Sequence, residues 1–428
     1  MKILLVTSRY PWPPRRGDQI RAVQALDFLS GEHEVTLLTP EPGKGQPPPP
    51  ADAPYRIELY RPNRTAALLP GMARVLLRNH PLQSLLFYQP DLGRRLRELA
   101  PQADLGILQL VRLAIHLDDF GDTPILVDLI DSLSLNFSLR ADVDRLLLRP
   151  LLRLEARLLA VGERRLAERA AGVVLVCGRD RQALVNRLPP ELASRVSVVH
   201  LSVRERRVEP PLERERLGED GETGPVLAMT GNLGYFVNVD AITWWLDEVW
   251  PAVRQVRPDV RVVVAGDRPA AVIRRAVAKA GPRVRLIESP RDMRSVLAQS
   301  TLSLAPMRCG SGVPIKVLEA WAVGVPVVAT PWAVAGTSGR QGEDFRVVGT
   351  HPIEWVTAIL ELLDDPAARE RLIENGRRRL ASDYSREVVR NQLLGVIRNL
   401  GLAPAGISLE APAAGPSPPA PLPQAGEG

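Results

Sequence analysis

LSLAPMRCGSGVPIKVLEAWAVGVPVVAT, residues 302–330, is the most informative segment of the sequence. An apolar run typical of a buried strand ends at Pro306, a glycine-rich loop follows at 309–312, and a helical pattern begins near Val313 or Pro314. Proline suits the first turn of a helix, and the free backbone N–H groups of that turn attract anions. The segment therefore predicts a strand, loop and helix of an α/β fold, with a candidate anion site at the loop.

Two charged side chains follow this loop on the predicted helix. Lys316 and Glu319 are three residues apart and therefore share one helix face. The lysine is placed to meet a phosphate, the glutamate to accept hydrogen bonds from ribose hydroxyls, and Gly310 and Gly312 let a phosphate approach the backbone. A tight turn with a surface ion pair has the same spacing, so the spacing alone leaves both interpretations open.

Short apolar runs alternate with helical patterns over the rest of the chain as well. In residues 240–256, for example, Ile242, Trp245, Leu246 and Val249 follow helical spacing. Apolar strands that alternate with helices are typical of parallel sheets buried on both faces. The sequence thus predicts two doubly wound, Rossmann-like α/β domains. The expected strands are 2–7, 35–39, 105–111, 124–130, 173–177, 196–199, 226–230, 260–265, 284–288, 302–305 and 325–330.

Length and composition exclude several classes of protein. A chain of 428 residues is too long for one ordinary core, and 45% hydrophobic residues suffice for two. A net charge of +6 and 4% aromatic residues are typical neither of a strongly basic surface nor of a stacking platform, so we expect no nucleic-acid partner. Cys177 and Cys309 are the only cysteines, too few for a zinc cluster or a disulfide framework, and they fit a reducing cytoplasm. The apolar runs are shorter than the ~18 residues of a spanning helix.

Changes in composition divide the chain. Helical and strand periodicity stop over 204–224, where charged residues dominate, and we predict a linker there between domains at 1–203 and 225–385. A last helix is expected at 386–402. The Ala- and Pro-rich tail, 403–428, is predicted to be disordered because it cannot bury a core.

The segment after the glycine loop resembles a known enzyme family. Residues Glu319–Ala329, EAWAVGVPVVA, are similar to the motif E-A-x-A-x-G-x-P-V-V-A of retaining glycosyltransferases of family 4, which have the GT-B fold. That family carries another glutamate eight residues earlier, where this chain has Ser311. The G-S-G loop with a lysine before Glu319 resembles a subset of members that are often exopolysaccharide sugar transferases.

The resemblance extends from residue 1 to about 400. The loop ending Arg15-Arg16-Gly17-Asp18 and the helix with Arg21 are similar to the family's first βαβ unit. Met229–Leu233 is similar to its glycine loop beside the donor diphosphate, and residues 366–384 also look like the family.

The resemblance implies an arrangement and a mechanism. The N-terminal domain would bind the acceptor and the C-terminal domain a nucleotide sugar, facing each other across a cleft, with helix 386–402 crossing back. The sugar would move with retention of its anomeric configuration, and the departing diphosphate oxygen would deprotonate the acceptor hydroxyl. The protein would then supply positioning and electrostatics. No metal and no other cofactor is implied.

Three sets of site residues follow from these motifs and the resemblance. The predicted donor-binding residues are Gly231, Asn232, Asn238, Arg291, Arg308, Gly310, Ser311, Gly312, Val313, Pro314, Lys316 and Glu319. The predicted acceptor or phosphate loop comprises Arg16, Gly17, Asp18, Arg21, Gln109 and Arg112. The catalytic candidates are Glu319, Lys316, Asp131 and Asp128. Both aspartates end a predicted strand, where doubly wound sheets bind ligands, although helix capping is an equal alternative for them.

Two further positions, besides Ser311, depart from the family's pattern. An arginine and a lysine that neutralise the diphosphate are replaced by Asn232 and Asn238. Each amide lacks the charge, so each removes a charge-assisted contact of roughly 1.5–3 kcal/mol. Lys316, Arg308 and Arg291 are the neighbouring cations expected to compensate. A nucleotide-sugar epimerase on the same fold and a non-catalytic binding subunit remain as alternatives.

A basic stripe suggests a further partner. Arg145, Arg149, Arg153 and Arg157 are spaced four apart among leucines, on a predicted helix kinked near Pro150. Such a stripe suits an anionic membrane and a lipid-linked acceptor, and the alternative is a helix packed on the sheet with its polar face in solvent. The resemblance to the glycosyltransferases implies a nucleotide-sugar donor, a glycan or lipid-linked acceptor, and a role in exopolysaccharide or cell-envelope polysaccharide biosynthesis. The expected location is the cytoplasm, and peripheral contact at the inner face of the membrane follows only from the first of these two interpretations of the stripe.

Overall fold

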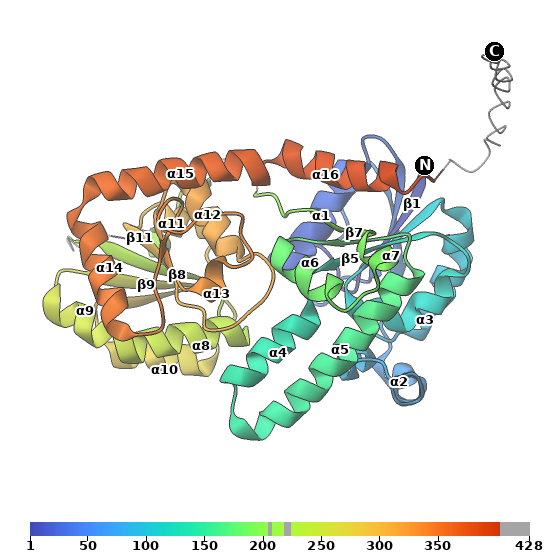
Figure 1. The fold of residues 1–428 in the computed structure, drawn as a ribbon, viewed down its shortest axis with the longest axis horizontal. Coiled ribbons are helices and arrows are strands. Elements are labelled where there is room, and N and C mark those ends of the chain that lie inside the picture. Colours follow the sequence, from blue (N-terminus) through green and yellow to red (C-terminus); the bar gives the residue numbers. More distant parts are fainter. Residues whose placement is uncertain (204–207, 218–223, 403–428) are drawn as a thin grey trace, which may run out of the picture.

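The structure is a computed structural model and describes residues 1–203, 208–217 and 224–402. It contains two parallel β-sheets, each covered by helices on both faces (Figure 1). No helix within these described ranges combines the length and the apolar character needed to span a bilayer.

The first sheet is built from seven strands of the N-terminal half. Their order is β3-β2-β1-β4-β5-β6-β7, and every adjacent pair is parallel. The strands are β1 Lys2–Val6, β2 Glu34–Pro40, β3 Arg56–Tyr60, β4 Leu105–Gln109, β5 Ile125–Ile130, β6 Gly172–Leu175 and β7 Val196–Val198. The α-helices are α1 Gly17–Leu29, α2 Arg64–Arg78, α3 Pro90–Leu99, α4 Leu133–Val143, α5 Arg149–Arg169, α6 Gly178–Val185 and α7 Pro190–Ala193. Short 3₁₀ segments are η1 Leu82–Leu86, η2 Ala100–Gln102, η3 Val111–Phe120 and η4 Leu146–Leu148.

The second sheet repeats this arrangement with six strands. Their order is β10-β9-β8-β11-β12-β13, again parallel throughout. The strands are β8 Val226–Asn232, β9 Arg261–Asp267, β10 Val284–Glu288, β11 Leu302–Ala305, β12 Val327–Ala329 and β13 Arg346–Val347. The helices are α8 Phe236–Trp244, α9 Trp250–Val256, α10 Ala271–Ala280, α11 Met293–Leu297, α12 Ile315–Val323, α13 Pro331–Val334, α14 Pro352–Asp364, α15 Pro366–Tyr384 and α16 Arg386–Asn399. The 3₁₀ turn η5 Glu213–Glu215 precedes this sheet, and the π-helical turn η6 Trp245–Val249 joins α8 to α9.

The predicted fold class, two doubly wound α/β domains, is confirmed. In each sheet the chain moves outward from the first strand in one direction and then returns to the other side of it. This leaves a switch point between β1 and β4 in the first sheet and between β8 and β11 in the second. Ligands of doubly wound sheets bind at the carboxyl ends of the strands beside such a point.

Burial explains why the apolar runs form central strands. Ile3 and Leu5 of β1 point into one core, where they pack with α1 and α16, while Leu4 and Val6 point into the core on the other face. Strands buried on both faces must be apolar at every position, as the sequence is here.

The last helix crosses back to the N-terminal domain. Val389, Leu393, Leu394 and Ile397 of α16 are buried in the same core as β1, while α15 packs on α12 of the C-terminal half. Figure 1 shows α15 and α16 following each other along one side of the molecule, over both sheets.

Several local expectations need correction. The strands β3 and β13 were not among the predicted ones. The sequence of β3 is interrupted by the charged residue Glu58, and β13 has only two residues, whereas the other two edge strands, β7 and β10, were predicted. Pro150 does not kink a helix but lies in the first turn of α5, where its missing N–H costs nothing. The predicted linker 204–224 lies partly outside the described residues, and the predicted disordered tail 403–428 lies wholly outside them.

Candidate functional site

The candidate site lies where the switch points of the two sheets meet. The Cβ position of Gly17, which opens α1 after β1, lies 3.9 Å from Cδ1 of Ile315, which opens α12 after β11. Arg15 Nη1 lies 3.5 Å from Asp267 Oδ1 at the end of β9. The predicted donor loop and the predicted acceptor loop therefore face each other directly.

The glycine-rich loop has a backbone that only glycine adopts without strain. Gly310 has φ +131° and Gly312 has φ +71°. A Cβ on Gly336, in the turn after α13, would lie 1.8 Å from the carbonyl oxygen of Gly312, so the two turns are in close backbone contact. Pro314 caps α12, which begins at Ile315, slightly later than the sequence predicted.

A carboxyl group already contacts the backbone of this loop. The N–H of Gly312 donates to Oδ2 of Asp180 at 3.0 Å, and the same oxygen accepts the N–H of Ser132 at 2.8 Å. Arg179 Nη1 donates to the carbonyl oxygen of Gly310 at 3.3 Å. Asp180 and Arg179 belong to α6 of the N-terminal domain, so the glycine loop binds a carboxylate across the interface in this arrangement.

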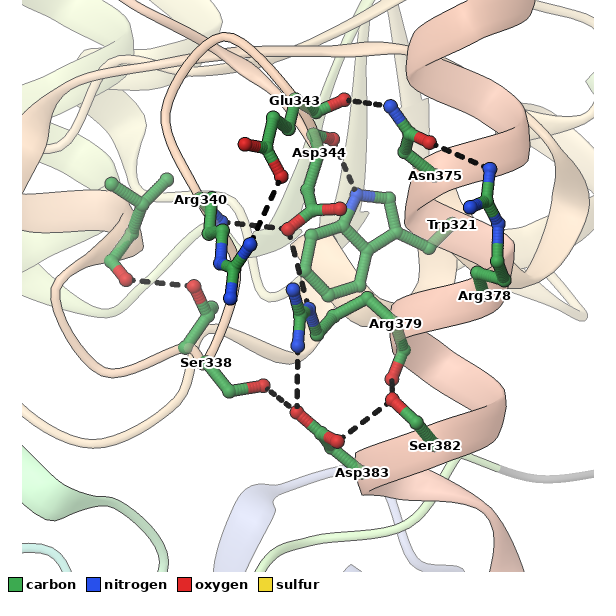
Figure 2. Close-up of polar contacts among 12 residues, drawn as sticks. Trp321, Ser338, Arg340, Glu343, Asp344, Asn375, Arg378, Arg379, Ser382 and Asp383 are labelled. Atoms are coloured by element: carbon green, nitrogen blue, oxygen red, sulfur yellow. Dashed lines mark hydrogen bonds and ion pairs between the residues drawn. The ribbon is translucent and has the colours of Figure 1, made fainter.

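A polar network holds the segment between α13 and β13, which packs on the glycine loop (Figure 2). The indole Nε1 of Trp321, on α12, donates to the carbonyl oxygen of Asp344 at 3.1 Å, and Arg379 Nε lies 3.3 Å from Oδ2 of Asp344. The hydroxyl of Ser338 donates to Asp383 on α15. These contacts attach the segment between α13 and β13 to α15, and that segment contains the turn that packs on the glycine loop.

Lys316 gathers with the predicted diphosphate residues. Its Nζ donates to Oδ1 of Asn238 at 2.7 Å, and Nδ2 of Asn238 donates to the carbonyl oxygen of Asn232 at 2.9 Å. Gly231 has φ +143°, and a Cβ there would lie 2.9 Å from Asn238 Nδ2 and 3.4 Å from Lys316 Nζ. Burial lowers the pKa of Lys316 to about 8, and the Glu319 carboxylate partly opposes this effect. Four predicted donor residues therefore converge beside the end of β8, with Glu319 near them on α12.

The two other expected cations are engaged elsewhere. Arg308 forms a two-pronged ion pair with Asp240, with Nε to Oδ2 at 2.9 Å, and lies over the ring of Trp244. Arg291 pairs with Glu209 at 2.5 Å between Nε and Oε2. The expectation that these arginines compensate for Asn232 and Asn238 is therefore not supported by their placement.

A distorted strand end turns Asp131 toward the C-terminal domain. The register of β5 shifts between Asp128 and Ile130, and Ile130 has φ +65°, which is rare for a β-branched residue and typical of functional sites. The hydroxyl of Ser311 donates to Oδ2 of Asp131 at 3.3 Å. Burial and the nearby Asp180 carboxylate raise the pKa of Asp131 to about 7.

Asn136 and Tyr235 complete this contact between the domains. Nδ2 of Asn136 donates to Oγ of Ser311 at 3.0 Å and to the Tyr235 hydroxyl at 3.2 Å. Ser311 thus has partners from two N-terminal residues at the position where the related family has a glutamate.

Asp128 has a different environment from Asp131. Its Oδ2 forms a buried ion pair with Arg21 Nε at 2.7 Å, and its Oδ1 accepts the N–H of Ile130. Arg21 also donates to the carbonyl oxygen of His200 at 2.8 Å. Both side chains are almost fully buried, at 1% and 6% exposure. We interpret Asp128 and Arg21 as a structural pair that supports the strand ends, rather than as groups that touch a substrate.

Three further residues of the predicted acceptor loop, Asp18, Gln109 and Arg112, lie in the N-terminal domain. Gln109 Nε2 donates to the carbonyl oxygen of Asp18 at 3.2 Å, and Arg9 forms an ion pair with Asp18. Arg112 Nε donates to Gln83 at 2.9 Å, while its Nη1 is buried without a hydrogen-bond partner.

Several residues of this interface were missed by the sequence analysis. Asp180, Asn136, Tyr235 and Gly336 come from four separate segments, and nothing in their local patterns indicates contact with the glycine loop. Only Tyr235, three residues after Asn232, lay near a recognised motif. In the described ranges, no three His, Cys, Asp or Glu side chains are grouped as metal ligands would be.

The fold of the chain is similar to that of several solved structures. Over 94% of the chain, the structure resembles sucrose-phosphate synthase from Thermosynechococcus elongatus, with a TM-score of 0.68, 16% identity and 99% of that chain covered. Anabaena HepE in complex with UDP-glucose matches with a TM-score of 0.64 and 14% identity, over 93% of this chain and 100% of that one. These similarities establish the GT-B fold.

The sequence supports a more specific placement. Residues 224–365, which include β8, the glycine loop and α12, match the family described as "Glycosyl transferases group 1". The similarity to the group 1 glycosyltransferases lies in this segment of the chain, and two curated relatives that match part of the chain are themselves glycosyltransferases.

Curated relatives are similar over part of their length. A GDP-mannose-dependent monoacylated alpha-(1-6)-phosphatidylinositol monomannoside mannosyltransferase of Corynebacterium glutamicum is 27% identical over 201 residues, 44% of this chain. An alpha-D-kanosaminyltransferase of Streptomyces kanamyceticus is 27% identical over 259 residues, 56% of this chain. The matches span 50% and 63% of these two relatives.

Proposed function

We propose that this protein is a retaining glycosyltransferase that transfers a sugar from a nucleoside-diphosphate sugar to a glycan or lipid-linked acceptor. One observation carries the proposal. Lys316, Asn238 and Asn232 converge with the positive-φ Gly231 at the switch point of the C-terminal sheet, inside the segment that matches the family. Close-approach backbone and a lysine at this place suit a diphosphate.

The proposed roles follow from these positions. Lys316 and the loop backbones bind the diphosphate, and Glu319 on the same helix face accepts hydrogen bonds from the ribose. Ser311 and Asp131 lie beside the transferred sugar, where a neutral Asp131 carboxyl can donate as well as accept a hydrogen bond. The departing diphosphate oxygen takes the acceptor proton, so the chain contributes orientation and electrostatic stabilisation without a nucleophile of its own, and no metal is required.

A peripheral membrane contact is part of the proposal. The side chains of Leu147 and Leu151, around the basic stripe, are 93% and 53% exposed, so this leucine face does not pack on the sheet. The 3₁₀ turn η1 lies against the same helix, because the N–H of Leu82 donates to Glu155 at 2.7 Å, and it adds Leu86 with 69% exposure. Exposed leucines among arginines suit an anionic membrane at the cytoplasmic face. Binding to vesicles with and without anionic lipid tests this contact, with Leu147→Asp expected to weaken it.

The polysaccharide role rests on resemblance. The G-S-G loop and the lysine before Glu319 are typical of exopolysaccharide enzymes, and we propose exopolysaccharide or cell-envelope polysaccharide biosynthesis on that basis. An epimerase would form an epimer or a free sugar from the donor in the absence of an acceptor. A binding subunit would not convert the donor unless its partner protein were present. The mannosyl- and kanosaminyltransferase relatives favour transfer over both.

Thermal unfolding in the presence of UDP, GDP and ADP tests the donor site. A ligand at ~100 times its dissociation constant adds roughly 2.7 kcal/mol to the free energy of unfolding. We expect one nucleoside diphosphate to stabilise the wild type and the Glu374→Ala control, an exposed position on α15, but not Glu319→Ala. No response to any nucleotide by the folded wild type would contradict the proposal.

A further inference from the structure

The diphosphate site lacks the cations expected of it. Asn232 and Asn238 provide amides, and Arg308 and Arg291 are held by Asp240 and Glu209. Lys316 alone, with a pKa of about 8, is only partly charged in mildly alkaline solution. A nucleoside diphosphate carries more negative charge than one such lysine neutralises.

Arg268 lies at this site with an unusual backbone. It directly follows β9, and its φ of +53° lies in the left-handed region that arginine seldom adopts. A Cβ on Gly234 would lie 2.9 Å from the carbonyl oxygen of Arg268, and the N–H of Leu233 donates to the carbonyl oxygen of Asp267 at 2.8 Å. The residue is thus held against the turn that follows Asn232, and its side chain is exposed. Strained residues cluster at ligand sites, which makes this arginine a candidate for binding.

Arg16 approaches the same turn from the N-terminal domain. It precedes Gly17, which contacts Ile315 beside Lys316, and it follows Arg15, which reaches Asp267 across the interface. Burial lowers the pKa of Arg16, the positive charges of Arg9 and Arg268 lower it further, and the carboxylates of Asp18 and Asp267 oppose this effect.

Neither guanidinium has its charge balanced by a direct pair. Within the described part of the chain, Arg16 and Arg268 form no ion pair, while Arg9 is paired with Asp18 and Arg15 lies 3.5 Å from Asp267. The carboxylates of Asp18 and Asp267 offset part of the repulsion between these like charges, and an anion bound between the two guanidinium groups offsets more of it.

We propose that Arg16 and Arg268 bind the donor diphosphate from opposite domains and replace the cations missing at positions 232 and 238. The inference rests on the proposed function. Guanidinium groups bind phosphate with paired hydrogen bonds, so two of them match the two phosphates of a nucleoside diphosphate. Because one arginine belongs to each domain, the diphosphate also holds the two domains together.

Calorimetric titration of the full chain with the preferred nucleoside diphosphate, and with its nucleoside monophosphate, tests this inference. We expect Arg16→Met and Arg268→Met each to weaken the diphosphate about tenfold or more, and to weaken the monophosphate much less. The matched control is Arg346→Met, which removes an exposed arginine of the same domain that is paired with Glu361 on α14, and it is expected to bind like the wild type. Introducing Asn232→Arg into Arg268→Met is expected to restore part of the affinity.

The outcomes separate this inference from the proposed function. Wild-type affinity in both methionine variants overturns the arginine clamp while leaving the donor site intact. Equal loss of diphosphate and monophosphate overturns it as well, because a phosphate clamp must discriminate between them. If the wild type binds neither nucleotide, the proposed function fails and the clamp fails with it. Thermal unfolding of each variant shows whether it is folded.

Discussion

Binding of a nucleoside diphosphate is expected to take up a proton at Lys316. Burial lowers the pKa of this ammonium to about 8 in the free protein, so at pH 8 about half of the lysines are neutral. A diphosphate next to Nζ favours the charged form. Binding at pH 8 should therefore take up about half a proton per nucleotide, and at pH 9 close to one.

Calorimetric titrations in buffers of different ionisation enthalpy measure this uptake directly. Lys316→Met removes the titrating group, so its uptake should vanish, and its affinity should fall by about tenfold to a hundredfold, the equivalent of a lost charge-assisted contact of ~1.5–3 kcal/mol. Lys279→Met is the control, since Lys279 is exposed on α10 and pairs with Asp247. Absence of uptake in the wild type, or equal uptake in Lys316→Met, would refute the assignment of Lys316 to the diphosphate.

Three further predictions concern the interface and its support. Because the pKa of Asp131 is raised to about 7, its contribution to stability is complete below pH 4 and is lost as the pH rises to 7, at up to about 1.4 kcal/mol per pH unit. Urea unfolding between pH 5 and 8 should show a smaller pH dependence for Asp131→Asn, and an unchanged slope would contradict this origin. Gly312→Ala should lower the free energy of unfolding by ~1–2 kcal/mol, because the φ of Gly312 is +71° and the new Cβ would lie 3.2 Å from the Cβ of Asp131. Gly395→Ala on α16 is the control: its new Cβ meets no atom within 4 Å, so it should not destabilise the protein. Arg21→Met should cost about 3–5 kcal/mol by leaving the buried Asp128 charge unpaired, as measured by urea unfolding; a loss below 1 kcal/mol would refute the structural role.

Local patterns predicted most of the central strands and the main motif. The central strands are buried on both faces, so each appears as a largely apolar run, whereas the edge strand β3 carries Arg56 and Glu58 and the edge strand β13 has only two residues. The turn at Gly310 and Gly312 was evident because close backbone approach requires glycine. The pairing of Lys316 with Asn238, 78 residues apart, was not evident in the same way, and it depends on how α12 is placed against α8.

The charge balance of the site illustrates the limit of local patterns. Arg308 lies next to the glycine loop in the sequence and was expected to bind the donor, but its guanidinium pairs with Asp240. The sequence did not predict a role for Arg268 or Asp180, because neither belongs to a motif. Both are brought to the site by the packing of segments that are separate in the sequence.

The sequence by itself determined the two doubly wound domains, the glycine loop and the face shared by Lys316 and Glu319. These features depend on apolar periodicity and on the backbone freedom of glycine, which act over a few neighbouring residues. Only the tertiary structure decided which charged groups remain available to a ligand. Ion pairs form between whichever side chains the two sheets bring within reach, so the roles of Arg16, Arg268 and Asp131 depend on how the domains meet.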